Sequence, residues 1–248
     1  MDFLNALALI TNYILLPGFT YGSQLALGAL GVTLIYAVLR FSNFAHGELM
    51  SFGAMICILF TWLGQSYGIN FGVLPTALIF LPIAIGFTAL YCFFIEKFVF
   101  AYYRRKKSDP IIFLIASIGV MFFTDGLIRF IIGPSDQNFN DGVRFIFNVR
   151  EFKAFTGLDE GFGLKTSQAI TILTTIILCS ILFVFLNKTR TGKSMRAFSD
   201  NEDLALLSGI DPNKVVLLTW VIAGGLATFA GVLYGLDKIY KPFIFLQM

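Results

Sequence analysis

Six long apolar segments, separated by shorter polar stretches, constrain the fold of this chain more than any other feature. A helix that crosses a membrane needs about 20 mostly apolar residues. Every segment except the second reaches that length. The predicted spans are residues 19–39, 49–64, 73–95, 110–132, 167–187 and 213–236.

The overall composition supports the same interpretation. Hydrophobic residues make up 57% of the chain and charged residues only 13%. A soluble domain has roughly 45–50% apolar and about 25% charged residues, so this chain could not cover a surface exposed to water. The sequence therefore predicts an all-α polytopic membrane protein, a bundle of about six transmembrane helices.

Two segments are too short to span a bilayer by themselves. The segment 49–64 can cross only if the preceding string SNFAHGE extends its helix, or if the bilayer thins locally. The segment 3–16 ends at Pro17-Gly18 and is predicted to form a separate interfacial or partly inserted helix.

The loop charges predict an orientation. Loops 96–109 and 188–214 are rich in lysine and arginine and lie on the same side of an alternating bundle. The positive-inside rule makes that side cytoplasmic. Loop 133–166 lies on the opposite side and mixes charges of both signs. We interpret it as a solvated connector, with a contact for an outside protein as the alternative.

The second basic loop contains the start and stop signals of a short helix. Ser199 and Glu202 have the spacing of a capping box. Gly209 follows as a C-terminal cap, and Asp211 with Pro212 begins the next helix. The pattern predicts a short amphipathic helix on the cytoplasmic surface between two spans.

The string SNFAHGEL, where the first span meets the second, concentrates polar groups at membrane depth. Ionisable residues there are costly and usually face a cavity or a partner. One interpretation is a broken entry to the second span that lines a path for solute. Its residues are Asn43, His46, Gly47 and Glu48.

The other interpretation of this string is purely structural. Ser42 or Asn43 would cap the second span, and Glu48 would pair with Arg40 near the interface. Without further information, the residues favour this structural interpretation.

Two further patterns concern packing. Asp125 and Arg129 share a helix face and are predicted to pair, with an ion relay as the less favoured alternative. Small residues at a spacing of four let helix backbones approach closely in lipid. The predicted packing residues are Gly22 and Ala26 in the first span, with Gly18, Gly28 and Gly31 as further small residues, and Ala223, Ala227, Gly231 and Gly235 in the last.

The sequence offers no catalytic, cofactor or metal site. His46 is the only histidine, and no nucleophile, base and orienting group can be assembled. The string TGKS at 191–194 lacks the first glycine of a phosphate-binding loop. The three cysteines lie in apolar runs, which indicates free thiols. We expect no enzyme activity and no nucleic-acid partner.

Residues 29–54, ALGVTLIYAVLRFSNFAHGELMSFGA, resemble the branched-chain amino acid permeases of ABC importers, of the LivH type, including an Asn-Phe-Ala-His-Gly signature. Residues 189–235 resemble the cytoplasmic loop and following span of that family. The family pattern Glu-Ala-Ala-x-x-x-Gly aligns there with Asp203, Leu204, Ala205 and Gly209, with aspartate and leucine replacing the first two residues.

The resemblance implies an importer subunit in the bacterial inner membrane. Its partners would be a second permease subunit (LivM-like, or a second copy of this chain), two cytoplasmic ABC ATPases, a periplasmic substrate-binding protein and membrane lipid. The solute would be a branched-chain amino acid or a related small polar molecule. The surface helix near 200–208 would be a coupling helix, formed by Ser199, Glu202, Asp203, Leu204, Ala205, Leu207 and Gly209.

Family members usually continue through a glycine-rich region with further spans, whereas this sequence stops at Met248. We therefore expect one permease domain over residues 1–248, truncated at its C-terminal end. Two other functions remain open: an ion-coupled transporter or channel that uses His46, Glu48 and Asp125, and a membrane scaffold that transports nothing.

Overall fold

The computed structural model describes residues 2–69, 72, 74–139, 145–157, 161–242 and 245. Within these residues, six helices are long and apolar enough to cross a membrane, which confirms the predicted fold class. Part of loop 133–166, residues 140–144 and 158–160, lies outside the described residues, as does Met248.

The described residues are mainly helical, and those of loop 133–166 include a two-stranded antiparallel sheet. Helices α4, η2 and α5 form one continuous span, and η1 and η2 are π-helical turns. The elements in order are α1 (Asp2–Ile10), η1 (Thr11–Leu15), α2 (Leu16–Leu39), α3 (His46–Ser66), α4 (Ala77–Ile95), η2 (Glu96–Phe100), α5 (Ala101–Arg105), α6 (Pro110–Ile132), β1 (Phe145–Phe147), α7 (Val149–Thr156), β2 (Leu164–Lys165), α8 (Thr166–Lys188), α9 (Arg190–Asp200), α10 (Glu202–Leu207) and α11 (Pro212–Asp237).

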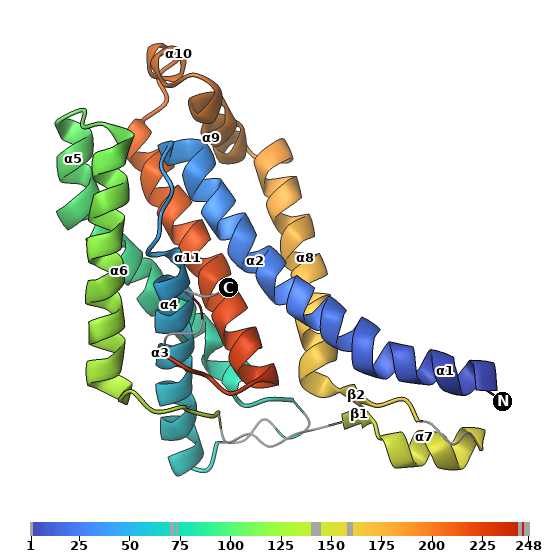
Figure 1. Cartoon of the computed structure of the whole chain (residues 1–248). Helices are drawn as coiled ribbons and strands as arrows, with labels where there is room; N and C mark the ends of the chain where they lie inside the picture. The colour runs from blue at the N-terminus through green and yellow to red at the C-terminus, as the bar shows by residue number, and fades with distance from the viewer. Residues whose placement is uncertain are drawn as a thin grey trace.

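Helix α11 forms the centre of the bundle. It packs against α2, α3 and α4, whereas α6 and α8 lie at the flanks (Figure 1). The side chains of Trp220 and Leu233 are fully buried, and most of the helix is enclosed by protein. By contrast, α6 and α8 expose large apolar side chains such as Phe122 and Phe183, as expected of helices that face lipid.

Small residues bring α11 and α3 into backbone contact. A Cβ atom added at Gly231 would overlap the carbonyl group of Met50. One added at Gly53 would lie 2.6 Å from the hydroxyl oxygen of Thr228. Only glycine permits this approach, and van der Waals packing at such contacts is what holds helices together in lipid.

Within the small-residue stripe predicted for the first span, Gly22 does not make a close helix contact. Gly22 is exposed, and a Cβ atom there would meet no described atom within 4 Å. Ala26 is half-buried. The close contact lies further along α2, where a Cβ atom on Gly31 would be 3.3 Å from the carbonyl oxygen of Ala223. The spacing of small residues predicted close packing of the first span, but it did not show which turn of α2 faces α11.

The prediction of a separate helix over residues 3–16 was wrong. Helix α1, turn η1 and helix α2 form one continuous candidate span from Phe3 to Leu39. Pro17 lies two residues after the π-helical turn ends at Leu15, where the hydrogen-bond register changes and the missing N–H of proline is tolerated. Pro17-Gly18 therefore does not end the helix.

The second span is extended as the sequence required. Helix α3 begins at His46, and it begins well below the level at which α2 ends (Figure 1). The connection between them starts at Arg40, which adopts the left-handed conformation with φ 59°. Phe41 anchors this connection, with its ring 5.1 Å from that of Phe100 and 5.2 Å from that of Phe113. The chain is thereby drawn into the bundle before α3 starts.

We predict that Gly231→Leu destabilises the folded protein by about 3 kcal/mol, because the new side chain must displace the backbone of α3. Thermal unfolding in detergent, followed by fluorescence-detected gel filtration, measures this effect. Gly22→Leu is the matched control and should leave the midpoint nearly unchanged. Equal losses of stability in the two variants would contradict the contact between α11 and α3.

Candidate functional site

The turn before α3 is organised by Asn43. Its side-chain oxygen accepts a hydrogen bond from the Ala45 N–H at 3.1 Å, and its carbonyl accepts one from the His46 N–H at 3.3 Å. Asn43 therefore organises the turn that leads into α3. Its side chain bonds to Ala45, the residue immediately before the helix begins. Ser42 is exposed and makes no such bond among the described residues. This fixed turn determines where the next polar side chains lie.

His46, the first residue of α3, is buried at the junction of three helices. Only 2% of its surface is exposed. Its ring packs on α2, where a Cβ atom on Gly31 would lie 2.6 Å from Nε2, next to Ala223 of α11. Neither ring nitrogen makes a hydrogen bond of standard geometry among the described residues, although the ring interacts with the backbone of Gly28 on α2. Gly47, which follows, is half-buried.

Glu48 is fully buried, and neither of its carboxylate oxygens has a partner in the described part of the chain. The predicted pairing of Glu48 with Arg40 is wrong. The guanidinium of Arg40 instead donates a hydrogen bond to the carbonyl of Ser199, at the surface end of α9. The two side chains cannot pair because they lie at different depths in the bundle. Arg40 is at the end of α2, whereas the connection after it places Glu48 in the interior.

A layer of hydroxyl groups surrounds this part of α3. Ser51, one turn after Glu48, lies 2.9 Å from the hydroxyl of Tyr240 and donates to the Pro242 carbonyl at 3.1 Å. The hydroxyl of Tyr91 on α4 lies 2.7 Å from that of Thr124 on α6. Glu48 interacts electrostatically with both tyrosines.

Tyr240 comes from the segment that follows α11. It is fully buried and pairs with Gln137 through two backbone hydrogen bonds of 2.9 and 3.0 Å. Beside it, Lys241 forms an ion pair with Asp136 at 3.2 Å. Burial raises the pKa of the Tyr240 hydroxyl well above its usual value, so this group keeps its proton and donates to the Ser51 carbonyl at 3.2 Å.

Asp125 and Arg129 pair on α6 as predicted, with 2.9 Å between the carboxylate oxygen and Nε. Both interact electrostatically with Glu48. Sequence reasoning missed Ser51 and Tyr240, because residues separated by 189 positions carry no local signal of their contact. It also missed the buried Gln24, whose amide donates to the Leu233 carbonyl at 3.4 Å. The sequence signal for Gln24 was a single amide side chain within an otherwise apolar segment.

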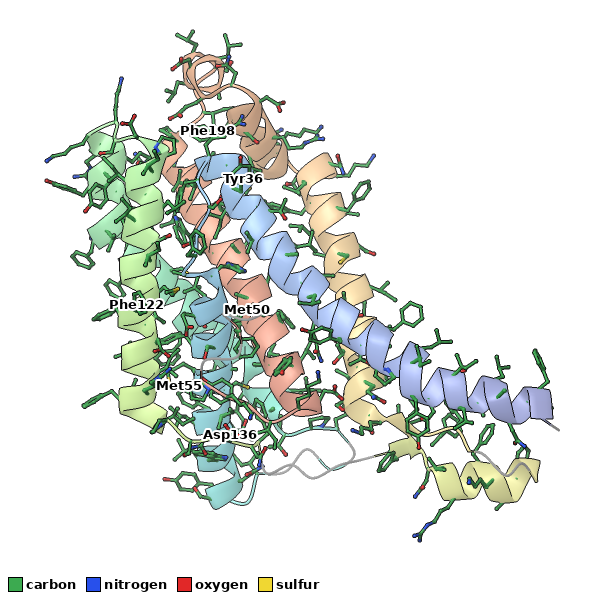
Figure 2. The ribbon with its side chains drawn as sticks, viewed as in Figure 1. Tyr36, Met50, Met55, Phe122, Asp136 and Phe198 are labelled. Atoms are coloured by element: carbon green, nitrogen blue, oxygen red, sulfur yellow. The ribbon has the colours of Figure 1, made fainter. Side chains whose placement is uncertain are left out.

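The depth of the site is visible in Figure 2. Met50 lies roughly midway between Phe198, near the surface helices, and Asp136, near the opposite end of the bundle. Helix α3 therefore has its first turn in the interior of the molecule.

The surface helix begins two residues later than the capping box predicted. The N-cap of α10 is Asn201, whose side-chain oxygen accepts a hydrogen bond from the Leu204 N–H at 3.0 Å. Ser199 does not cap it. Ser199 lies inside α9, and its hydroxyl donates to the Ala37 carbonyl of α2 at 2.8 Å. Asparagine is as good an N-cap as serine, so the choice depended on where the preceding helix ends.

That preceding helix, α9, was missed altogether. Thr189 caps it, accepting a hydrogen bond from the Gly192 N–H at 3.0 Å. Met195 and Phe198, on one face of α9, are buried against Leu34 of α2 and Val215 of α11. The sequence did contain a signal, because a threonine cap precedes two apolar residues at helical spacing.

Helix α10 presents apolar side chains to the surroundings. Leu204 is 61% exposed and Leu207 is 85% exposed, whereas Ala205 is buried. Glu202 and Asp203 are exposed in its first turn. The end of the loop is as predicted. Gly209 has φ 80° and, with the following residue, closes the helix by hydrogen bonds to Leu206 and Ala205. Asp211 and Pro212 begin α11.

We predict that Asn201→Ala frees the first turn of α10, since losing an N-cap costs about 1 kcal/mol. Hydrogen exchange of residues 202–207 should become several-fold faster, as measured by mass spectrometry. Ser199→Ala is the control and should leave exchange in α10 unchanged, because Ser199 bonds to α2. Faster exchange in Ser199→Ala, with unchanged exchange in Asn201→Ala, would instead identify Ser199 as the N-cap of α10.

Comparisons with known proteins agree with this architecture. Residues 14–248 match the family described as "Branched-chain amino acid transport system / permease component". The high-affinity branched-chain amino acid transport system permease protein LivH of Escherichia coli (strain K12) is 31% identical over 92% of this chain and 71% of the relative. The corresponding protein BraD of Pseudomonas aeruginosa is 27% identical, over 90% of this chain and 70% of the relative.

A probable branched-chain amino acid transport permease protein LivH of Methanocaldococcus jannaschii is 28% identical over 85% of this chain and 62% of the relative. No solved structure matches the chain significantly. With six candidate spans, the chain is a multi-pass protein of the bacterial inner membrane. It belongs to the branched-chain amino acid transport permease family and is a permease subunit of an ABC importer.

Proposed function

We propose that the chain forms part of the translocation path for branched-chain amino acids or related small polar solutes. The path would be lined by Asn43, His46, Gly47 and Glu48, where α3 begins. One observation carries this proposal. Glu48 is buried at the centre of an apolar bundle with no hydrogen-bond partner in the described part of the chain, and His46 is buried two residues before it, against the Gly28 backbone. Polar groups kept at that cost in a transporter usually belong to a solute path.

The energy source would lie in other subunits. The sequence has no phosphate-binding loop, because TGKS lacks the first glycine. We therefore propose two cytoplasmic ABC ATPases as partners, with a periplasmic substrate-binding protein delivering the solute. A LivM-like permease or a second copy of this chain would complete the path. The names of the LivH and BraD relatives, which describe transport-system permeases, support this assembly.

Helix α10 is the proposed contact with an ATPase. Leu204 and Leu207 are too exposed for a monomer surface in water, and they suit an apolar groove on a partner. Glu202 and Asp203 would lie at the rim of that groove. Ala205 joins α10 to the apolar cluster that holds α9 against α2 and α11. Ser199 strengthens the same joint through its bond to Ala37.

This arrangement supports a mechanical connection between the surface and the path. A push on α10 would pass through α9 to α2 and α11, which are the helices that enclose His46. Coupling of this kind needs packed elements with two arrangements, and rigid helices joined at a surface can provide it. The fixed turn at Gly209 keeps α10 and α11 in a defined relation.

The transport proposal is tested with the assembled transporter in liposomes. Uptake of radiolabelled leucine should require the binding protein and ATP, and should continue when a protonophore collapses the proton gradient. Uptake that follows the proton gradient without ATP would instead support the ion-coupled transporter. Absence of uptake under every condition would favour a scaffold.

We predict that Leu207→Glu lowers ATP-driven uptake at least tenfold while leaving membrane insertion intact, because a charge would enter the proposed apolar contact. Uptake in liposomes and the amount of folded permease measure the two effects. Thr191→Glu is the matched control, since it adds the same charge in the first turn of α9 at an exposed position. Normal uptake by the Leu207 variant would contradict the coupling role of α10.

A further inference from the structure

We propose that Glu48 binds the ammonium group of the transported solute. This inference rests on the proposed transport function and adds to it the chemical group that the chain itself recognises. It makes Glu48 a binding residue within the path, rather than one polar group among several that line it.

The first argument is the isolation of the carboxylate. Glu48 is fully buried, and both of its oxygens lack a hydrogen bond or ion pair within the described residues. The other deeply buried glutamate of the described chain, Glu96, has a partner, because Arg104 pairs with it. A buried charge without a partner is strongly disfavoured, so Glu48 has an unmet need for a positive charge.

The second argument is that the helix end offsets part of the cost of a buried negative charge. Glu48 is the third residue of α3, so it lies in the first helical turn. The unpaired N–H groups and the macrodipole at a helix N-terminus stabilise a negative charge there. Because α3 begins inside the bundle, this effect acts at depth and is little screened by water.

The third argument is that nearby cations are already engaged. Arg129 on α6 interacts with Glu48 at longer range, but its Nε is paired with Asp125 at 2.9 Å. Arg40 donates to Ser199 at the surface. His46, two residues before Glu48, packs on Gly31 of α2 and so faces another side of α3. None of these three groups forms an ion pair with Glu48, so a cation from outside the chain could supply one.

The lining suits an ammonium group. Ser51 and Phe52 share the Glu48 face of α3, being three and four residues further on. Ser51 and Tyr240 provide hydroxyl oxygens. The Tyr91 ring, stacked on Phe52 at 4.4 Å, provides an aromatic wall, and aromatic faces attract organic cations. The aromatic wall is the part of this lining that favours an organic cation.

Tyr240 closes this region in the present conformation. Its hydroxyl holds Ser51, and its backbone holds Gln137. Glu48 is fully buried here, so solute binding would require neighbouring groups to move, and Tyr240 is one group that could move away from α3.

The test uses the assembled transporter in nanodiscs without the binding protein, so that the permease site alone is measured. Radiolabelled leucine is the probe. Isoamylamine keeps the amine and lacks the carboxylate, whereas 4-methylpentanoate keeps the carboxylate and lacks the amine. Isoamylamine should compete with leucine, and 4-methylpentanoate should not. Glu48→Gln should weaken leucine binding at least tenfold.

Glu96→Gln is the matched control, because it neutralises a buried acid that already has a partner; leucine binding should be unchanged. Wild-type transporter that binds no leucine, or binds it without competition by the amine, would overturn the inference even if Glu48→Gln misfolds. The inference would also be overturned if leucine binding depended only on sodium ions and not on the amine of the solute. ATP-driven uptake by the same wild-type preparation shows separately whether the proposed transport function holds.

Discussion

The contact between the backbones of α3 and α11 is the constraint on which the rest of the structure depends. Gly231 meets the Met50 carbonyl, and Gly53 meets Thr228, so the two helices touch where any larger residue would separate them. In a membrane, apolar side chains gain little by leaving lipid for one another, so close packing of this kind is a main source of helix association. With α11 enclosed by α2, α3 and α4, the remaining helices can present apolar faces to lipid.

This contact has a direct consequence for the site. Because α3 is held against the middle of α11, its first turn lies within the bundle, and the chain must descend from Arg40 to reach it. That descent places His46 against α2 and Glu48 among the hydroxyl groups of α3, α4 and the segment after α11. A helix that started at the membrane surface would have left Glu48 near Arg40. The unusual burial of Glu48 is therefore a product of helix packing.

The sequence predicted what depends on local pattern. Apolar length identified all six spans, Gly209 and Pro212 marked the end of α10 and the start of α11, and the spacing of Asp125 and Arg129 predicted their pair. The failures involve choices between equivalent local signals or distant contacts. Gly22 and Gly31 look alike in the sequence, and only the crossing with α11 distinguishes them. Ser199 and Asn201 are both good caps, and the missed helix α9 decided between them. The contact of Ser51 with Tyr240 had no local signal.

Helices α9 and α10 at the surface are connected to the interior site at the start of α3 by α2 and α11, which contact both. The depth at which α3 begins can be measured in an experimental map of the transporter in nanodiscs at side-chain resolution. The first turn of α3 should lie near the middle of the bilayer, with Met50 against Gly231 and Glu48 away from the lipid headgroups. A continuous α3 that begins at the membrane surface, with Glu48 paired to Arg40, would show that this description of the site is wrong.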